Sequence, residues 1–555
     1  MKTKRFALLA ILVLALIFIA ACRQNETSTP EEAPTPTAAP EDTQTPEDNQ
    51  DEEIEEQQPE DREIITVSVM NWGVANSFSD DGEICELYQY VIDHFGIMFE
   101  PIDVGWDNHV ELAHLWAAAN TLPDIIGAAD FVATPTLSSW AEAGIIRPLP
   151  DNMERFPYLY HMVRQPSVTA FDIDGQTFFI PRGNDPYPEY TAMARGIINR
   201  RDWRESLGIP IPQTPEDFMD MWRAFMENDM MGDGSIVFGV LPDSTGILND
   251  QAFATFGDTR HAWVQMPNGD MVIPGFERSA LPLMSFWRDA FQEGLVDPDF
   301  ITNPSGVSQE LFALGRAGTL IRQIAPLHLR LVYDRFVELT DIDFFEAVEI
   351  LMPPTVPGIT PQFLRGTGFW SETYFSSRLD DYTMDRVMEY FNWAASPTGI
   401  ATLQFGFEGR DWQWSAEGMI EQLTDINPDT NMPFRANAMY TFAAGGMGNL
   451  VMWGGAIEYV DPSIDPRLIN MAREFLDNLL ENYEFTPVDN RLRAINLDEV
   501  NEMPLRVSEE FVAFMTNSTA TSHEELWEQF HSRWVANGLQ RAYDAMTAEV
   551  AARGY

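Results

Sequence analysis

The stretch that decides the fold is Ile64-Ile65-Thr66-Val67-Ser68-Val69-Met70, an apolar run rich in β-branched residues that predicts a buried strand. An amphipathic helix is expected over residues 87–95, a second strand over 98–104, a helix over 109–120 and a strand over 122–127. Strands that alternate with helices indicate an α/β fold with a mainly parallel sheet. Ligands of such sheets bind beyond the carboxyl ends of the strands.

The residues before this stretch look like an export signal and a tether. A basic start, residues 1–5, precedes an uncharged apolar run over residues 6–21. This is the layout of a signal peptide. The run is short for a transmembrane helix, which needs about 20 apolar residues. The run ends Ile19-Ala20-Ala21-Cys22 and resembles the lipobox of bacterial lipoproteins, which implies cleavage after residue 21 and lipidation of Cys22, with palmitate among the expected acyl chains. The alternative is a plain signal peptide with a chance cysteine.

Residues 22–63 are rich in Pro, Glu, Thr, Asp and Gln and hold almost no large apolar side chain. Such a segment cannot bury enough surface to fold, so we expect a disordered acidic linker. We therefore expect a protein on the outer face of the cell membrane, held there by its lipid.

The charge of the chain is strongly acidic, with 86 Asp and Glu against 34 Lys and Arg and a net charge of −52. This charge argues against binding to nucleic acid or to an anionic lipid surface, because phosphate contacts need basic residues. Lys2 and Lys4 are the only lysines, and arginine stays charged at high pH. The use of arginine in place of lysine fits an alkaline or saline habitat, and it fits codon bias equally well. Two cysteines and eight scattered histidines indicate no disulfide framework, no metal cluster and no cofactor.

Later segments carry an ordered series of family motifs. The series contains an Ala-rich helix end followed by Pro123-Asp124-Ile125-Ile126, the segment 140–149, the hinge entry Asp174-Gly175-Gln176-Thr177-Phe178-Phe179-Ile180-Pro181, the segments 197–203 and 207–208, Pro212-Gln213-Thr214-Pro215-Glu216-Asp217-Phe218, and the segments 312–318, 405–409 and 511–543. In this order they resemble the extracellular solute-binding proteins of ABC importers, in the branch that includes maltose-binding protein, and most closely the lipoprotein-anchored sugar binders of Firmicutes.

The resemblance implies two α/β lobes, joined by hinge strands, that close on a ligand. The first lobe is expected to hold residues 64–181 and about 353–405, and the second residues 182–352 and about 406–555. The implied function is capture of a carbohydrate, in particular an oligosaccharide, and its delivery to the permease subunits of an ABC transporter by a monomeric binding protein.

Sugar rings present apolar faces, on which aromatic side chains stack, and a rim of hydroxyl groups, which charged and amide side chains bind. Trp203 and Trp222 have helical spacing and apolar neighbours, so we expect them in the core. Glu408 has a structural alternative, as an acceptor of backbone hydrogen bonds in its own loop. Position along the chain gives the candidate ligand-binding residues: Trp72, Asn76, Asp130, Tyr187, Tyr190, Arg322, Gln323, Trp370, Glu408 and Trp412.

Other functions remain open at this stage. The same fold could bind a peptide, a polyamine or a sugar acid, or present its ligand to a membrane sensor. A cell-surface glycoside hydrolase would need a pair of carboxylates, and no nucleophile elbow, zinc-protease motif or phosphate-binding loop is present, so we expect no enzyme activity. The segment 228–235 occupies the place of a calcium loop in many relatives, but Met230 and Met231 stand where oxygen ligands would be needed. We expect a helix-to-strand turn there.

Overall fold

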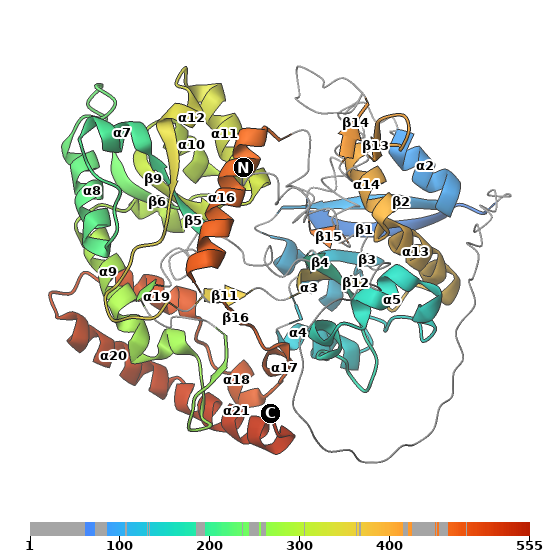
Figure 1. The fold of residues 1–555 in the computed structure, drawn as a ribbon. Coiled ribbons are helices and arrows are strands. Elements are labelled where there is room, and N and C mark those ends of the chain that lie inside the picture. Colours follow the sequence, from blue (N-terminus) through green and yellow to red (C-terminus); the bar gives the residue numbers. More distant parts are fainter. Residues whose placement is uncertain are drawn as a thin grey trace, which may run out of the picture.

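The computed structural model shows two lobes side by side (Figure 1). Within the part of the chain that it describes, no helix is both long and apolar enough to cross a membrane. The described residues are 62–72, 86–105, 108–129, 131–132, 134–184, 195–235, 237–243, 255–256, 262–304, 306–361, 363–365, 368–414, 420–423, 450, 452–453, 464–483 and 485–555.

The first lobe is built on a six-stranded sheet. Its strand order is β15 (Met452–Trp453), β4 (Phe179–Asn184), β12 (Phe369–Phe375), β3 (Ile125–Ala129), β1 (Ile65–Trp72) and β2 (Ile97–Val104). β1 pairs in parallel with β2 and β3, β15 pairs in parallel with β4, and β12 is antiparallel to both of its neighbours. The carboxyl ends of β1, β2, β3, β4 and β15 therefore share one edge of the sheet with the amino end of β12. We call this the first edge.

Alternation along these strands produces two apolar faces, as the period of two in a strand requires. Val67, Val69 and Ile125 point to one face, and Met70 and Ile126 point to the other. One face is covered by α2 (Glu86–Phe95), α5 (Pro157–Val163), α13 (Asp381–Ala394) and α14 (Pro397–Phe405), and the other by α3 (His109–Ala118), α4 (Pro135–Glu142) and α6 (Pro166–Thr169). The predicted α/β fold is confirmed.

The second lobe is built on a four-stranded sheet in the order β10 (Val348–Leu351), β5 (Arg195–Arg200), β9 (Ala317–Gln323), β6 (Phe238–Pro242). β5 runs antiparallel to both β10 and β9, and β6 runs parallel to β9. The carboxyl ends of β6, β9 and β10 therefore share an edge with the amino end of β5, and we call this the second edge.

This sheet also separates two cores. The first is formed with α7 (Arg201–Ser206), α8 (Pro215–Glu227), α9 (Leu281–Gln292), α19 (Val507–Met515), α20 (His523–Ala536) and α21 (Leu539–Arg553). The other is formed with α10 (Val307–Ala313), α11 (Pro326–Leu339), α12 (Phe344–Ala347) and α16 (Pro466–Asn482). Trp203 and Trp222 are buried in the first of these cores, so their predicted core role is confirmed. Thr214 and Asp217 start α8 with a capping box, in which each side chain accepts a hydrogen bond from the other residue's backbone N–H.

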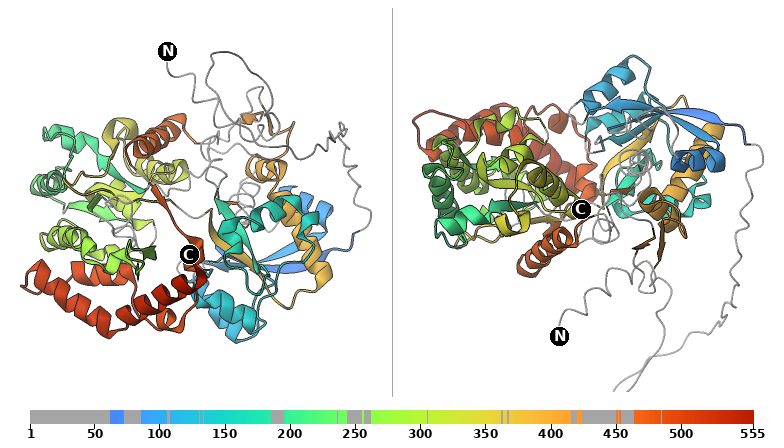
Figure 2. Two further views of the ribbon diagram at one scale, coloured as in Figure 1. Left: turned by 60° about the horizontal axis from the view of Figure 1, so that its bottom comes forward. Right: turned by 90° about the horizontal axis from the view of Figure 1, so that it is seen from above.

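Figure 2 shows the two lobes from two further sides. Smaller elements complete the structure. They are β7 (Val264–Gln265), β8 (Met271–Val272), β11 (Phe363–Arg365), β13 (Trp412–Trp414), β14 (Ile420–Gln422), β16 (Phe485–Pro487), α17 (Asn490–Arg493) and α18 (Asp498–Asn501). α17 and the residues after it reach from the second lobe to the first. Asn490 Nδ2 donates to the Ser167 carbonyl (3.2 Å) and Asn496 Nδ2 donates to Ser138 Oγ (2.8 Å).

One part of the predicted division into lobes differs from the structure. Residues 406–555 were all expected in the second lobe, but Trp412 lies in the core of the first lobe and β15 extends its sheet. The physical reason is the apolar surface of the first-lobe core, against which Trp412, Ile420 and Leu450 pack. The chain returns to the second lobe only with α16.

Candidate functional site

The two sheet edges belong to one interlobe region, because the chain crosses between them three times. It leaves β4 at Asn184 and enters β5 at Arg195, leaves β10 at Leu351 and enters β12 at Phe369, and leaves β15 at Trp453 before α16. The ten residues between Asn184 and Arg195 span at most about 40 Å. The crossings therefore join the first edge to the second, and in α/β folds such strand ends are the usual place of ligand sites.

The second edge carries a fixed charge network. Arg322, near the end of β9, is 6% exposed, and its Nη1 donates to Asp243 Oδ2 at 2.7 Å. The other oxygen of Asp243 accepts from the Ser308 hydroxyl. With the Gln309 amide nitrogen oriented to donate to the Gly306 carbonyl (3.1 Å), the amide oxygen accepts from Arg322 Nη2 (2.8 Å). The guanidinium is held in one orientation, so it needs little reorganisation to bind a ligand.

Arg195 and His328 extend this network. Arg195, the first residue of β5, pairs in register with Gln323 at the end of β9. The pKa of His328 is lowered to about 3, first by burial and then by the positive charges of Arg322 and Arg195, while Asp243 acts in the opposite direction. The imidazole is therefore neutral at physiological pH, and Arg322, Arg195 and Asp243 are the described charged groups that act on it.

The first edge carries an aromatic and cationic pair. Trp370, at the start of β12, is half-buried, and the guanidinium carbon of Arg182 lies 5.0 Å from the centre of its ring. Arg182 is 1% exposed, and its Nη1 approaches Ser371 Oγ at 3.4 Å. Burial lowers the pKa of Arg182 to about 9, because removal from water destabilises the charged form. A ring backed by a cation is a platform for the apolar face of a sugar.

Glu372 positions the loop that follows β3. This carboxylate is fully buried, and its Oε1 accepts from the backbone N–H groups of Phe131 (2.5 Å) and Val132 (2.9 Å) and from the Tyr374 hydroxyl (2.8 Å). Ser371, next to it, has a positive φ of 60° within an irregular stretch of the β12 ladder. The strained backbone and the buried carboxylate together fix this end of the sheet.

The structure brings three of the sequence-predicted residues to these edges. Arg322 and Gln323 are the last two residues of β9, and Trp370 is the second residue of β12. Trp72 ends β1 at the first edge, although its side chain is not described. Asn76, Asp130, Tyr187 and Tyr190 lie outside the described residues, as does the proposed lipidation site Cys22.

Two predicted residues lie elsewhere. Trp412 is 0% exposed in the first-lobe core, and its Nε1 donates to the Gly406 carbonyl at 2.8 Å, so the expected ligand contact is wrong for this side chain. Trp414, two residues further along the same face of β13, packs edge-on against Trp412 with ring centres 5.2 Å apart and is 40% exposed. Glu408 is exposed in the turn before β13. The structural role considered for it belongs to Asp411, which accepts from the Phe407 N–H (2.9 Å) and pairs with Arg410 (2.7 Å).

Sequence reasoning missed Arg182, Arg195, Asp243, His328 and Glu372. Three of them had a usable signal, because Arg182 lies near the end of β4, Asp243 directly follows β6 and Arg195 begins β5. The rule that ligands meet the carboxyl ends of strands, applied to the second lobe as well, would have selected Asp243. Glu372 and His328 had no such signal, since one is inside a strand and the other is inside a helix.

The segment 228–235 forms the turn between α8 and β6. Asp229 Oδ2 accepts from the Gly234 N–H (3.1 Å) and Asp233 Oδ1 accepts from the Ser235 N–H (2.8 Å), so backbone groups occupy one oxygen of each carboxylate. Met231 packs so closely against Gly315 that a side chain there would meet its sulfur. Among the described residues no group of three or more His, Cys, Asp or Glu is arranged to hold a metal ion.

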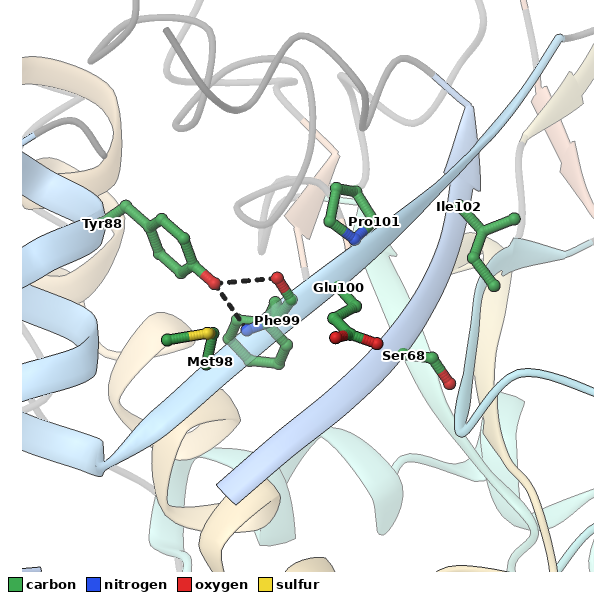
Figure 3. Close-up of a pocket in the computed structure, with 7 residues that line it drawn as sticks. All are labelled: Ser68, Tyr88, Met98, Phe99, Glu100, Pro101 and Ile102. Atoms are coloured by element: carbon green, nitrogen blue, oxygen red, sulfur yellow. Dashed lines mark hydrogen bonds between the residues drawn. The ribbon is translucent and has the colours of Figure 1, made fainter. Parts of the chain in front are cut away.

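A separate hollow of about 520 Å³ lies on the outer edge of the first sheet, lined by Ser68, Tyr88 and Met98–Ile102 (Figure 3). The Tyr88 hydroxyl donates to the Phe99 carbonyl (2.8 Å) and accepts from the Phe99 N–H (2.6 Å). Pro101 has no N–H to offer on the same side. The Tyr88 hydroxyl satisfies the backbone groups of Phe99, and Pro101 offers no donor, so the edge strand β2 is protected from pairing with another strand. These residues of the hollow therefore have a structural role that needs no ligand.

Solved structures of other proteins share this architecture. No protein-family model matches the chain. Among solved structures, the alginate-binding protein AlgQ2, crystallised without calcium ion, superposes with a TM-score of 0.66 and 16% identity over 88% of this chain and 98% of AlgQ2. FusA, the substrate-binding protein of an ABC transporter of Streptococcus pneumoniae, was solved in complex with kestose. It superposes with a TM-score of 0.65 and 15% identity over 88% of this chain and 99% of FusA. This chain has the two-lobed fold of the ABC-transporter solute-binding proteins.

Sequence relatives agree with this solute-binding fold. The polygalacturonan/rhamnogalacturonan-binding protein YtcQ of Bacillus subtilis is 26% identical over 212 residues, which are 37% of this chain and 40% of YtcQ. Lipoprotein LipO of the same species is 28% identical over 133 residues, 22% of this chain and 26% of LipO. The matched part of the chain thus spans 40% or less of the length of these curated relatives. The resemblance predicted from the sequence motifs is confirmed.

Proposed function

We propose that this protein binds an oligosaccharide between its two lobes and delivers it to an ABC permease. The single observation that carries the proposal is that three chain crossings join the edge with the Trp370 ring to the edge with the charge network of Arg322. Trp370 stacks on the face of a sugar ring, while Arg322, Gln323 and Asp243 bind its hydroxyl groups. The ligand-binding roles expected for Trp72, Asn76, Asp130, Tyr187 and Tyr190 belong to the same proposal.

Closure and tethering complete the proposed cycle. A ligand that contacts both edges stabilises a closed arrangement of the lobes, and the permease recognises that arrangement. A lipid on Cys22 and the acidic linker over residues 23–63 keep the monomeric binder close to its membrane partner. The similar proteins YtcQ, AlgQ2 and FusA are binding proteins, which supports capture of the sugar without chemical change.

The test is isothermal titration of the purified protein with a panel of neutral and acidic oligosaccharides, followed by chromatography of the recovered sugar. We expect saturable binding of at least one oligosaccharide and recovery of the sugar intact. Cleavage products would point to a hydrolase, and binding of peptides in place of sugars would overturn the proposal. For the anchor, Cys22→Ser is expected to move the protein from the membrane fraction to the medium and to abolish its labelling by radioactive palmitate.

A further inference from the structure

The chain after α16 joins the two lobes in addition to the three crossings. β16 pairs in parallel with β11, which lies inside the second crossing, between β10 and β12. Pro487 ends β16 in register with Arg365, and α17 begins at Asn490. The segment 485–496, which we call the clasp, therefore starts at the hinge and leads away from it.

The clasp is anchored in the second lobe. The ring centre of Phe485 lies 5.4 Å from that of Phe363, which is fully buried in the second-lobe core. Leu492 and Ile495 are buried in a small apolar cluster with side chains of β8 and α21. These contacts make the clasp a part of the second lobe.

The opposite side of the clasp is docked on the first lobe, where it meets α4 and α6 (Figure 1). Asn490 is 7% exposed, and its Nδ2 donates to the Ser167 carbonyl at 3.2 Å. Ala494 packs against the first-lobe core, and Asn496 Nδ2 donates to Ser138 Oγ at 2.8 Å. One short segment therefore binds both lobes.

Burial and position both favour a lasting contact. Asn490 Oδ1 accepts from Arg493 Nη1 at 3.1 Å, so both ends of its amide are hydrogen-bonded, and separation of the lobes here would break a buried hydrogen bond. A Cβ on Gly368, the residue before β12, would lie 3.2 Å from Ser167 Oγ. The docking point thus adjoins the place where the second crossing enters the first lobe. A contact beside a hinge moves little when the lobes bend, because displacement in a rotation grows with distance from the axis.

We propose that the clasp is a fourth, non-covalent link between the lobes, which restricts their relative motion to a bend at the hinge. A protein restricted in this way samples fewer open arrangements, so it loses less conformational freedom when a ligand joins the two edges. This inference goes beyond the proposed function, because it concerns the protein without ligand and needs no particular sugar.

The test measures the distance between the lobes in the absence of sugar. Cys22 and Cys85, the only two cysteines, are replaced by serine, and spin labels are attached to Thr398→Cys on α14 and Glu474→Cys on α16, two exposed positions in different lobes. Pulsed electron resonance then gives the distribution of interlobe distances.

Asn490→Ala removes the buried contact with Ser167, and we expect it to broaden this distribution. Asn496→Ala removes the exposed contact with Ser138 and should broaden it less, and it decides the matter if circular dichroism shows that Asn490→Ala does not fold. The control is Asn228→Ala, whose amide likewise donates to a backbone carbonyl, that of Ala224 at 2.8 Å, but within the second lobe.

An unchanged or narrower distribution in the deciding variant overturns the inference, and so does equal broadening in Asn228→Ala. No sugar is present in the measurement, so either result leaves the proposed function to be judged by its own titration.

Discussion

The two edges of the interlobe region use their carboxylates, the buried Glu372 and the partly exposed Asp243, in opposite ways. At the first edge Glu372 binds backbone N–H groups and holds a loop, while the surface offered to a ligand is the Trp370 ring. At the second edge Asp243 binds a guanidinium and holds it toward the ligand. In the proposed function, the first lobe therefore binds the apolar faces of the sugar rings and the second lobe binds their hydroxyl groups. Substitutions at Glu372, Trp370 and Asp243 each change one side of this comparison.

The largest effect is expected from Glu372→Ala. It leaves the N–H groups of Phe131 and Val132 and the Tyr374 hydroxyl without their buried acceptor, at a cost of about 2–5 kcal/mol in the free energy of unfolding. Urea unfolding measures this loss. Glu372→Gln keeps an acceptor and is the matched control, so it should cost clearly less. Equal stability of all three proteins would show that the carboxylate does not hold the loop.

A binding effect without a stability effect is expected from Trp370→Ala. Loss of the aromatic platform should weaken binding of the sugar by about 1–2 kcal/mol, or roughly tenfold, while the melting temperature changes little because the ring is half-buried. Trp414→Ala, which removes an exposed tryptophan in β13, is the control for titration calorimetry. If both variants bind as the original protein does, the aromatic role of the first edge is wrong.

Asp243→Asn tests the second edge. It keeps the shape of the side chain but removes the charge that orients Arg322, so affinity should fall by about 1 kcal/mol. Asp334→Asn is the control, because Asp334 pairs with Arg330 on α11 in the same lobe. Should the affinity of Asp243→Asn instead rise, Asp243 would be a competitor of an anionic ligand rather than the group that orients Arg322.

The smallest effect is expected at an ion pair away from both edges. The hydrogen bond with Arg223 lowers the pKa of Glu293, so this carboxylate binds protons less readily in the folded state than in the unfolded one. Its contribution to stability is complete above the unfolded pKa of about 4.3 and disappears as the pH falls through the folded value. The pair is partly exposed, so we expect about 0.5 kcal/mol or less.

Denaturant titrations of the original protein and Arg223→Gln at a series of pH values measure this contribution. The difference in the free energy of unfolding between the two proteins should be present at pH 6 and vanish near pH 2. A difference that grows on acidification would have the wrong sign and would contradict the lowered pKa.

The sequence predicted those parts of the fold that depend on local pattern. The β-branched runs of β1 and β3 and the helical spacing of Trp203 and Trp222 identify strands and core residues directly. Arg322 and Gln323 were found because they end a strand. Trp412 was misplaced because a local motif does not show that the β13–β14 strands pack against the first-lobe core, which buries this tryptophan.

The buried network at the edges was beyond prediction for a different reason. Glu372 contacts residues about 240 positions earlier in the chain, and Arg182 meets Trp370 across 188 positions. Such contacts depend on the pairing of β12 between β3 and β4, and no local pattern in the chain encodes the partner of an inserted antiparallel strand.

The most direct test of the proposed site is a crystal structure of the protein with a bound oligosaccharide. One ligand is expected between the two lobes, with a sugar ring stacked on Trp370 and a hydroxyl group within hydrogen-bond distance of Arg322. A ligand that contacts a single lobe, or that occupies the hollow beside Tyr88 on the outer edge of the first sheet, would contradict it.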